Sequence, residues 1–218
     1  MLYGFVPKWL EKLERWMPWL AIPHIAFFLV GLQVLGWLLV MSDPNAWGVL
    51  VLDPQLVMKG EVWRLGSFLA LPLSTSLLWT AFVLYFLYFI VNGIESEWGA
   101  FKTTVYVVTS VLLTIVFSFV FQVPIASVQH FESTLFLAAA AIAPDYEILL
   151  FFVLPVKLKW LAWLTVAFVL WQFFLGSWLT KVYLVALYAN YLLFFGSYHW
   201  WQGKQWIRRQ KMKGQFRR

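Results

Sequence analysis

The chain reads GEVWRLGSFLALPLSTSLLWTAFVLYFLYFIVNGIESEWG over residues 60–99, and this stretch decides the fold. It opens with a loop that contains the pair Trp63 and Arg64, continues into a long apolar run, and ends at Glu95 and Gly99. Charged side chains that flank a hydrocarbon-length segment cost free energy in a bilayer, so they usually have a structural or functional role. We therefore expect Arg64 and Glu95 to hold defined positions in a membrane-embedded fold.

The composition places the whole chain in the membrane class. Of its 218 residues, 62% are hydrophobic and 12% are charged, and the mean hydropathy is +0.77. A soluble domain has about 45–50% apolar and about 25% charged residues. The 15 tryptophans and nine tyrosines are also typical of residues that sit at membrane–water interfaces. We predict an integral, multi-pass membrane protein, with the lipid bilayer as its first partner.

Several kinds of chemistry are excluded or disfavoured by the same counts. The chain has no cysteine, which excludes disulfides, thiol nucleophiles and cysteine-ligated metals. Its three histidines, His24, His130 and His199, are too few and too scattered to favour a zinc site. We expect no metal and no other cofactor.

The net charge of +6 is concentrated at the C-terminus. Residues 203–218 contain no acid and these basic residues: Lys204, Arg208, Arg209, Lys211, Lys213, Arg217 and Arg218. A nucleic-acid-binding arm is one interpretation. Because the segment directly follows a membrane span, the positive-inside rule favours a basic cytoplasmic tail that faces anionic lipid. We therefore expect no nucleic-acid partner.

The N-terminal residues 1–18 have the pattern of an amphipathic helix. Trp9, Leu10, Leu13 and Trp16 recur at helical spacing, with charged residues between them. A helix of this kind lies in the interface plane of the membrane. The segment lacks the short apolar core and small-residue cleavage site of a signal peptide, so we expect no cleavage.

Residues 19–202 are predicted to form an all-α membrane domain of six helices. The expected spans are 19–41, 77–94, 101–121, 133–143, 160–174 and 182–200. The fourth is too short to cross a bilayer by itself, and its alanines suit a buried position. An even number of crossings puts both termini on one side, which the basic tail assigns to the cytoplasm. A bacterial inner membrane is the favoured location, and the oligomeric state stays open.

Three motifs resemble the rhomboid superfamily of intramembrane serine proteases and their inactive, derlin-like relatives. The motif residues are Trp63 and Arg64 in the first loop, Tyr88, Glu95, Trp98 and Gly99 in the second span, and Pro155, Lys157, Lys159 and Trp160 before the fifth. The resemblance implies a rhomboid-like six-helix bundle and a structured first loop over 42–66, partly submerged in the outer leaflet. It also implies structural roles for these residues.

The residues that a rhomboid protease needs for catalysis are absent. Residues 100–175 contain no glycine, so the family's G-x-S-G turn cannot form, and Ser133 is the nearest serine. The position of the family's catalytic histidine corresponds to Ala189, beside Asn190, and the positions of its oxyanion donors correspond to Trp79 and Val83. A serine hydroxyl needs a base within hydrogen-bond reach, and the intermediate needs aimed donors.

These losses favour a catalytically inactive pseudoprotease, with no catalytic residue, that binds transmembrane segments of client proteins. Arg64, Glu95, Ser133 and Asn190 are its expected interior polar groups, and the loop around Trp63 is the expected client-facing rim. One alternative is an active serine endopeptidase that uses Ser133, with His130 on the same helical face; we instead expect Ser133 at a helix N-cap. The other alternative is a small transporter or structural membrane protein. The client stays open.

Overall fold

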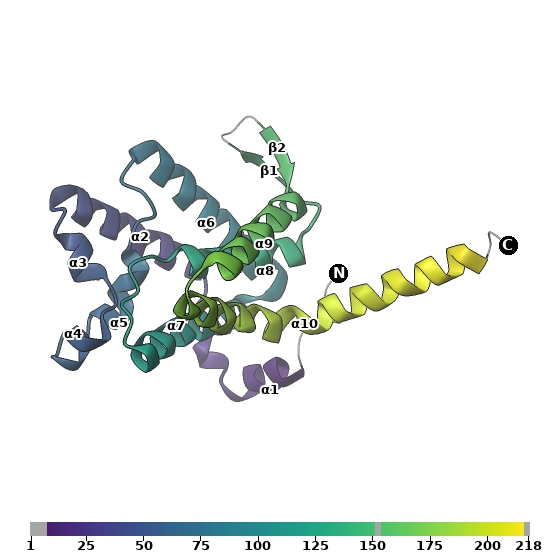
Figure 1. Cartoon of the computed structure of the whole chain (residues 1–218), viewed down its shortest axis with the longest axis horizontal. Helices are drawn as coiled ribbons and strands as arrows, with labels where there is room; N and C mark the ends of the chain where they lie inside the picture. The colour runs from purple at the N-terminus through teal and green to yellow at the C-terminus, as the bar shows by residue number, and fades with distance from the viewer. Residues whose placement is uncertain (1–7, 151–153, 216–218) are drawn as a thin grey trace.

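The computed structural model describes residues 8–150 and 154–215 (Figure 1). Within this part of the chain, five helical segments are long and apolar enough to cross a membrane. They are Pro18–Ser42 (η1 and α2), α6 (Leu77–Trp98), α7 (Ala100–Phe121), α9 (Leu158–Leu175) and the part Trp178–Gln205 of α10 (Trp178–Gln215). The predicted all-α, multi-pass membrane bundle is confirmed at this level.

One end of the bundle joins α1 (Lys8–Trp16), the start of α2 (Ile25–Ser42), the end of α6 and the start of α7. The backbone N–H of Ile22 donates to the Thr104 hydroxyl at 3.0 Å, and Lys102 Nζ lies 3.8 Å from a Glu14 carboxylate oxygen. The His24 N–H donates to the Glu95 carboxylate at 2.7 Å. We call this the α1 end.

The opposite end is built from the first loop and the segment that follows α7. The loop folds into α3 (Ala46–Leu50), α4 (Pro54–Met58), α5 (Arg64–Ser67) and the short η2 (Phe68–Ala70). A two-way backbone bridge ties Leu52 to Ile125, with N···O distances of 3.1 and 2.8 Å. We call this the loop end.

The short helix α8 (Gln129–Ile142) forms the centre of the bundle. Ten of its residues are buried, including the whole run from Ala138 to Ala141. α8 packs against α6, α7, α9 and α10, and Figure 1 shows it behind α9. Small alanine side chains allow neighbouring helices to approach closely, which explains why so apolar a helix can be surrounded by others.

The start of α8 differs from the sequence-based prediction. The helix begins at Gln129, one turn before the predicted start, so Ser133 lies inside the helix and the N-cap prediction was wrong. The residue at the N-cap is Val128, which makes no side-chain cap bond. Tertiary burial of Phe131 and Thr134 extends the helix beyond what local capping signals indicate.

A small hairpin and a long last helix complete the described chain. Strands β1 (Glu147–Leu150) and β2 (Leu154–Lys157) pair antiparallel beside the start of α9, a feature that the all-α prediction omitted. In Figure 1, α10 continues straight away from the bundle towards the C-terminus. The predicted basic segment is therefore helical as far as Gln215, and residues 216–218 lie outside the described residues.

Candidate functional site

The Arg64 side chain holds the first loop together. Only 5% of the residue is exposed, and all three nitrogens of its guanidinium have partners. Nε and Nη2 each lie 2.7 Å from a Glu61 oxygen, while Nη1 donates to the carbonyls of Gly48 and Val51 at 2.7 and 2.8 Å. All of these contacts are with other residues of the first loop, whereas the neighbouring Trp63 is 54% exposed.

The motif at the end of α6 joins three helices. Glu95 accepts the His24 N–H through one carboxylate oxygen, and its other oxygen is buried without a partner among the described residues. Trp98 is buried and stacks on Phe195 of α10, with ring centroids 4.6 Å apart. Gly99 has φ +88°, a conformation that only glycine adopts without strain, and it separates α6 from α7.

Tyr88 and the motif before α9 make packing and ion-pair contacts with neighbouring elements. The Tyr88 ring lies 5.0 Å from the Phe27 ring of α2. Pro155 and Lys157 belong to β2, and Lys157 faces Glu147 of β1 at 3.8 Å. Lys159 Nζ lies 2.6 Å from Asp145, and the hydrogen bond and charge of this lysine lower the pKa of the Asp145 carboxyl. Trp160 is 64% exposed on α9.

Ser133 has no imidazole as a hydrogen-bond partner. Its Oγ donates to the backbone carbonyl of His130 at 2.8 Å and lies 2.5 Å from the Tyr188 hydroxyl of α10. A hydroxyl has one proton, so the carbonyl takes it and the phenol of Tyr188 donates to Ser133. The His130 ring instead packs edge-on against Tyr183 and Tyr188, with centroids 5.6 and 6.4 Å away.

The other positions that match family catalytic residues do not converge on Ser133. Asn190 is buried, and its amide donates to the Ser110 hydroxyl at 2.7 Å and the Tyr106 carbonyl at 3.3 Å on α7. Ala189 is exposed on α10, Trp79 is 44% exposed, and Val83 is half-buried on α6. The hydrogen-bond partners of Ser133 are therefore a backbone carbonyl and a phenol.

Sequence reasoning missed two polar contacts beside Ser133. Tyr188 was not singled out, and neither was the hydrogen bond that Gln33 of α2 donates to Glu132 of α8. A signal was present, since Gln33 is the one amide in an 18-residue apolar helix, and such residues usually face a bundle interior. Within the residues that the structure describes, no three His, Asp or Glu side chains gather as metal ligands do.

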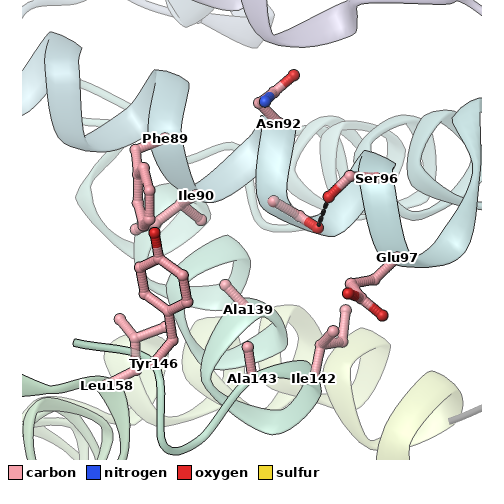
Figure 2. A pocket seen from close by; sticks show the side chains of 11 residues that line it. Phe89, Ile90, Asn92, Ser96, Glu97, Ala139, Ile142, Ala143, Tyr146 and Leu158 are labelled. Carbon is pink, nitrogen blue, oxygen red and sulfur yellow. Dashed lines mark hydrogen bonds between the residues drawn. The ribbon is translucent and has the colours of Figure 1, made fainter. Parts of the chain in front are cut away.

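A cavity of about 230 Å³ lies between α6 and α8, close to the α1 end (Figure 2). Ala139 of α8 and the residue that caps this helix, Ala143, form one wall, and Ser96 and Glu97 of α6 lie on the other. Asn92 also borders the cavity, but Figure 2 shows its side chain pointing away from α8. Figure 2 shows Tyr146 closing one side of this space, opposite Glu97. We call it the α6–α8 cavity. It combines a shallow apolar floor with hydrogen-bonding groups along one edge.

Comparisons with known proteins identify no relative. No family model, no curated protein and no solved structure matches this chain.

Proposed function

We propose that this chain is a rhomboid-like membrane protein without protease activity that binds transmembrane segments of client proteins. The observation that carries the proposal is the α6–α8 cavity, whose alanine wall and polar edge suit an apolar helix that contains a polar residue. Alanines let a second helix approach closely, and polar groups in a membrane helix gain by pairing with hydrogen-bonding partners. Glu97 supplies such a partner, and Ser96, whose hydroxyl donates to the Gly93 carbonyl, can still accept a hydrogen bond.

The path of the chain through α8 supports a six-crossing, rhomboid-like arrangement. Just before α8, Ile125 is bridged to Leu52 at the loop end. Just after α8, Ala143 lines the same cavity as Ser96 and Glu97, which lie near the α1 end. A crossing at α8, added to the five long spans, would bring the total to the six that we propose. Both termini then lie on one side, and the basic end of α10 favours the cytoplasm.

The length of α8 supports a role in handling membrane helices. Its 14 residues extend only about 21 Å at 1.5 Å per residue, less than a hydrocarbon core of about 30 Å. A bundle with so short a central crossing can thin the surrounding bilayer. A client helix with polar residues would lose less free energy in a thinned region, because its ends stay closer to water.

A photo-crosslinking experiment tests client binding. A photoreactive phenylalanine analogue replaces Phe89 in the cavity lining or, as the control, Leu38 on α2, which is 49% exposed. We expect crosslinks to model transmembrane peptides that contain one central asparagine only from position 89. Ala143→Trp fills the cavity and should abolish them, whereas Ala167→Trp, on the exposed side of α9, should not. Equal crosslinking from positions 89 and 38 would rule out this binding site.

The competing protease function is tested at Ser133. The hydroxyl is held by a carbonyl and a phenol, so we expect no labelling of the purified protein by a serine-reactive fluorophosphonate. Labelling that disappears in Ser133→Ala, together with cleavage of a membrane-anchored peptide, would establish the protease and overturn the proposal.

A further inference from the structure

A second cavity, of about 390 Å³, lies on the other side of α8, between α8, α9 and α10. Its floor is apolar and includes Ala140, Ala141 and Ala162, whose small side chains leave the space open. Its mouth carries Lys159 and His199. We call it the α8–α10 cavity. Because α8 separates it from the α6–α8 cavity, it is independent of the proposed client site.

The mouth of this cavity is placed where lipid headgroups lie. Lys159 stands in the first turn of α9, directly after the hairpin. His199 lies near the end of the apolar part of α10, followed by Trp200 and Trp201, which are 69% and 45% exposed. Tryptophans of this kind mark the membrane–water interface. The mouth therefore faces headgroups, while the alanine floor extends towards the acyl chains.

Lys159 at the mouth pairs with Asp145, the residue that follows the lining residue Pro144. Lys159 Nζ lies 2.6 Å from Asp145 Oδ1, and their side chains are 40% and 70% exposed. The His199 ring is held by a 2.6 Å hydrogen bond between its Nε2 and the Tyr191 hydroxyl. An ammonium group has three N–H donors, so Lys159 can bind a second acceptor while it keeps Asp145.

This charge pattern selects among lipids. An exposed ion pair adds little stability by itself, so the informative feature is that its lysine lines an open apolar cavity. A phosphate can bind Lys159, but Asp145 would repel a lipid whose headgroup has only negative charge. A headgroup that also carries a primary ammonium places that group against Asp145, with charge-assisted hydrogen bonds at both ends. A choline headgroup lacks N–H donors and cannot do this.

We propose that the α8–α10 cavity binds one zwitterionic aminophospholipid, phosphatidylethanolamine, with its phosphate on Lys159, its ammonium on Asp145 and an acyl chain along Ala140, Ala141 and Ala162. The bound lipid occupies the leaflet at the C-terminal end of α10. It fills the space between α9 and the rest of the bundle, where α9 itself contributes Leu158 as its one buried residue among those described.

Native mass spectrometry of the full chain tests this binding. The protein is delipidated in detergent and titrated separately with phosphatidylethanolamine, phosphatidylglycerol and phosphatidylcholine. We expect one phosphatidylethanolamine to bind about tenfold more tightly than the other two, since one charge-assisted contact is lost with each. Lys159→Gln and Asp145→Asn should each weaken binding about tenfold. Lys157→Gln is the matched control, because Lys157 pairs with Glu147 and does not line the cavity.

A variant that fills the cavity separates this site from annular lipid. Ala162→Trp should remove the tightly bound lipid, whereas Ala143→Trp, on the opposite side of α8, should keep it. Circular dichroism and size-exclusion chromatography confirm that each variant is folded. Three results would overturn the proposal: equal effects of Lys159→Gln and Lys157→Gln, unchanged binding in Ala162→Trp, or tighter phosphatidylglycerol binding that increases further in Asp145→Asn.

Discussion

Buried polar residues show how individual side chains hold this bundle together. Arg64 satisfies one carboxylate and two backbone carbonyls at once, which a loop without regular hydrogen bonding needs when it is partly buried. Lysine carries the same charge on a single ammonium group and cannot reproduce the planar fork. The role of Arg64 is therefore geometric as well as electrostatic.

Substitution of Arg64 should destabilise the protein more than the loss of an ordinary surface charge. Arg64→Ala leaves the Gly48 and Val51 carbonyls unpaired, and we expect a loss of about 3 kcal/mol in the free energy of unfolding. Arg64→Lys should lose less, because it keeps one or two of these contacts. Chemical denaturation in detergent measures the change, with Lys59→Ala, at an exposed position of the same loop, as the control. Equal stability of Arg64→Ala and Lys59→Ala would contradict this role.

Asn190 should stabilise the contact between α10 and α7. Its amide donates to the Ser110 hydroxyl at 2.7 Å, and both residues are buried. Interhelical hydrogen bonds in membrane bundles contribute about 0.6 kcal/mol on average, with a maximum near 2. We expect a coupling energy of about 1 kcal/mol in a double-mutant cycle of Asn190→Ala and Ser110→Ala. Additive effects of the two substitutions would show that the bond contributes nothing.

At the scale of elements, one glycine sets how closely α2 approaches the first loop. A Cβ atom at Gly36 would lie 1.8 Å from the carbonyl oxygen of Ala70, a backbone atom of η2. The helix can pack there only because residue 36 has no side chain. Gly31, in the same helix, has no atom within 4 Å of its Cβ position. Substitution of Gly36 therefore tests the close packing of two helices, whereas substitution of Gly31 tests only the helix propensity of the residue.

Gly36→Ala and Gly31→Ala should change stability in opposite directions. The first forces α2 and η2 apart and should cost about 3 kcal/mol or prevent folding. The second adds a better helix former at an open position and should gain about 0.5 kcal/mol. Thermal unfolding in detergent, followed by circular dichroism, reports both. A Gly36→Ala protein as stable as the wild type would show that α2 does not pack against η2 in this way.

The connection between α8 and α9 should respond to acid in a predictable direction. Lys159 lowers the pKa of the Asp145 carboxyl, so the ion pair contributes stability above the ordinary aspartate pKa of 3.8 and loses it as the pH falls through the lower, folded value. A ¹³C NMR titration of the Asp145 carboxyl should therefore have its midpoint below 3.8. Lys159→Gln should raise this midpoint clearly, and Lys157→Gln only slightly. Equal midpoints in all three proteins would exclude the contact.

At the scale of the whole molecule, the cysteine-free chain is ready for a topology experiment. Single cysteines at Lys12 and Lys204 probe the two terminal regions, and one at Lys59 probes the loop end. With six crossings, a membrane-impermeant maleimide should label positions 12 and 204 from one side of the membrane and position 59 from the other. Labelling of positions 12 and 204 from opposite sides would leave five crossings and exclude the rhomboid-like arrangement.

The membrane class and most helix boundaries follow from the sequence, because apolar runs of spanning length and their breakers are local features. Leu77 and Phe121, predicted as the start of one span and the end of the next, are the limits of α6 and α7 in the structure. Each of the five long spans can be predicted from its own length and hydropathy, without information about the helices that pack against it. A segment in the hydrocarbon core must satisfy its backbone hydrogen bonds internally, so an apolar run of this length predicts a helix from its composition alone.

Tertiary structure alone decided the start of α8, the hairpin and the neighbours of each polar side chain. The helix extends back to Gln129 because burial among α6, α7 and α10 overrides local capping at Ser133. The contacts of Ser133 with Tyr188, and of Gln33 with Glu132, join residues 55 and 99 positions apart. Such pairs depend on how helices rotate and pack, and hydrophobic periodicity in one segment contains no information about the rotation of another.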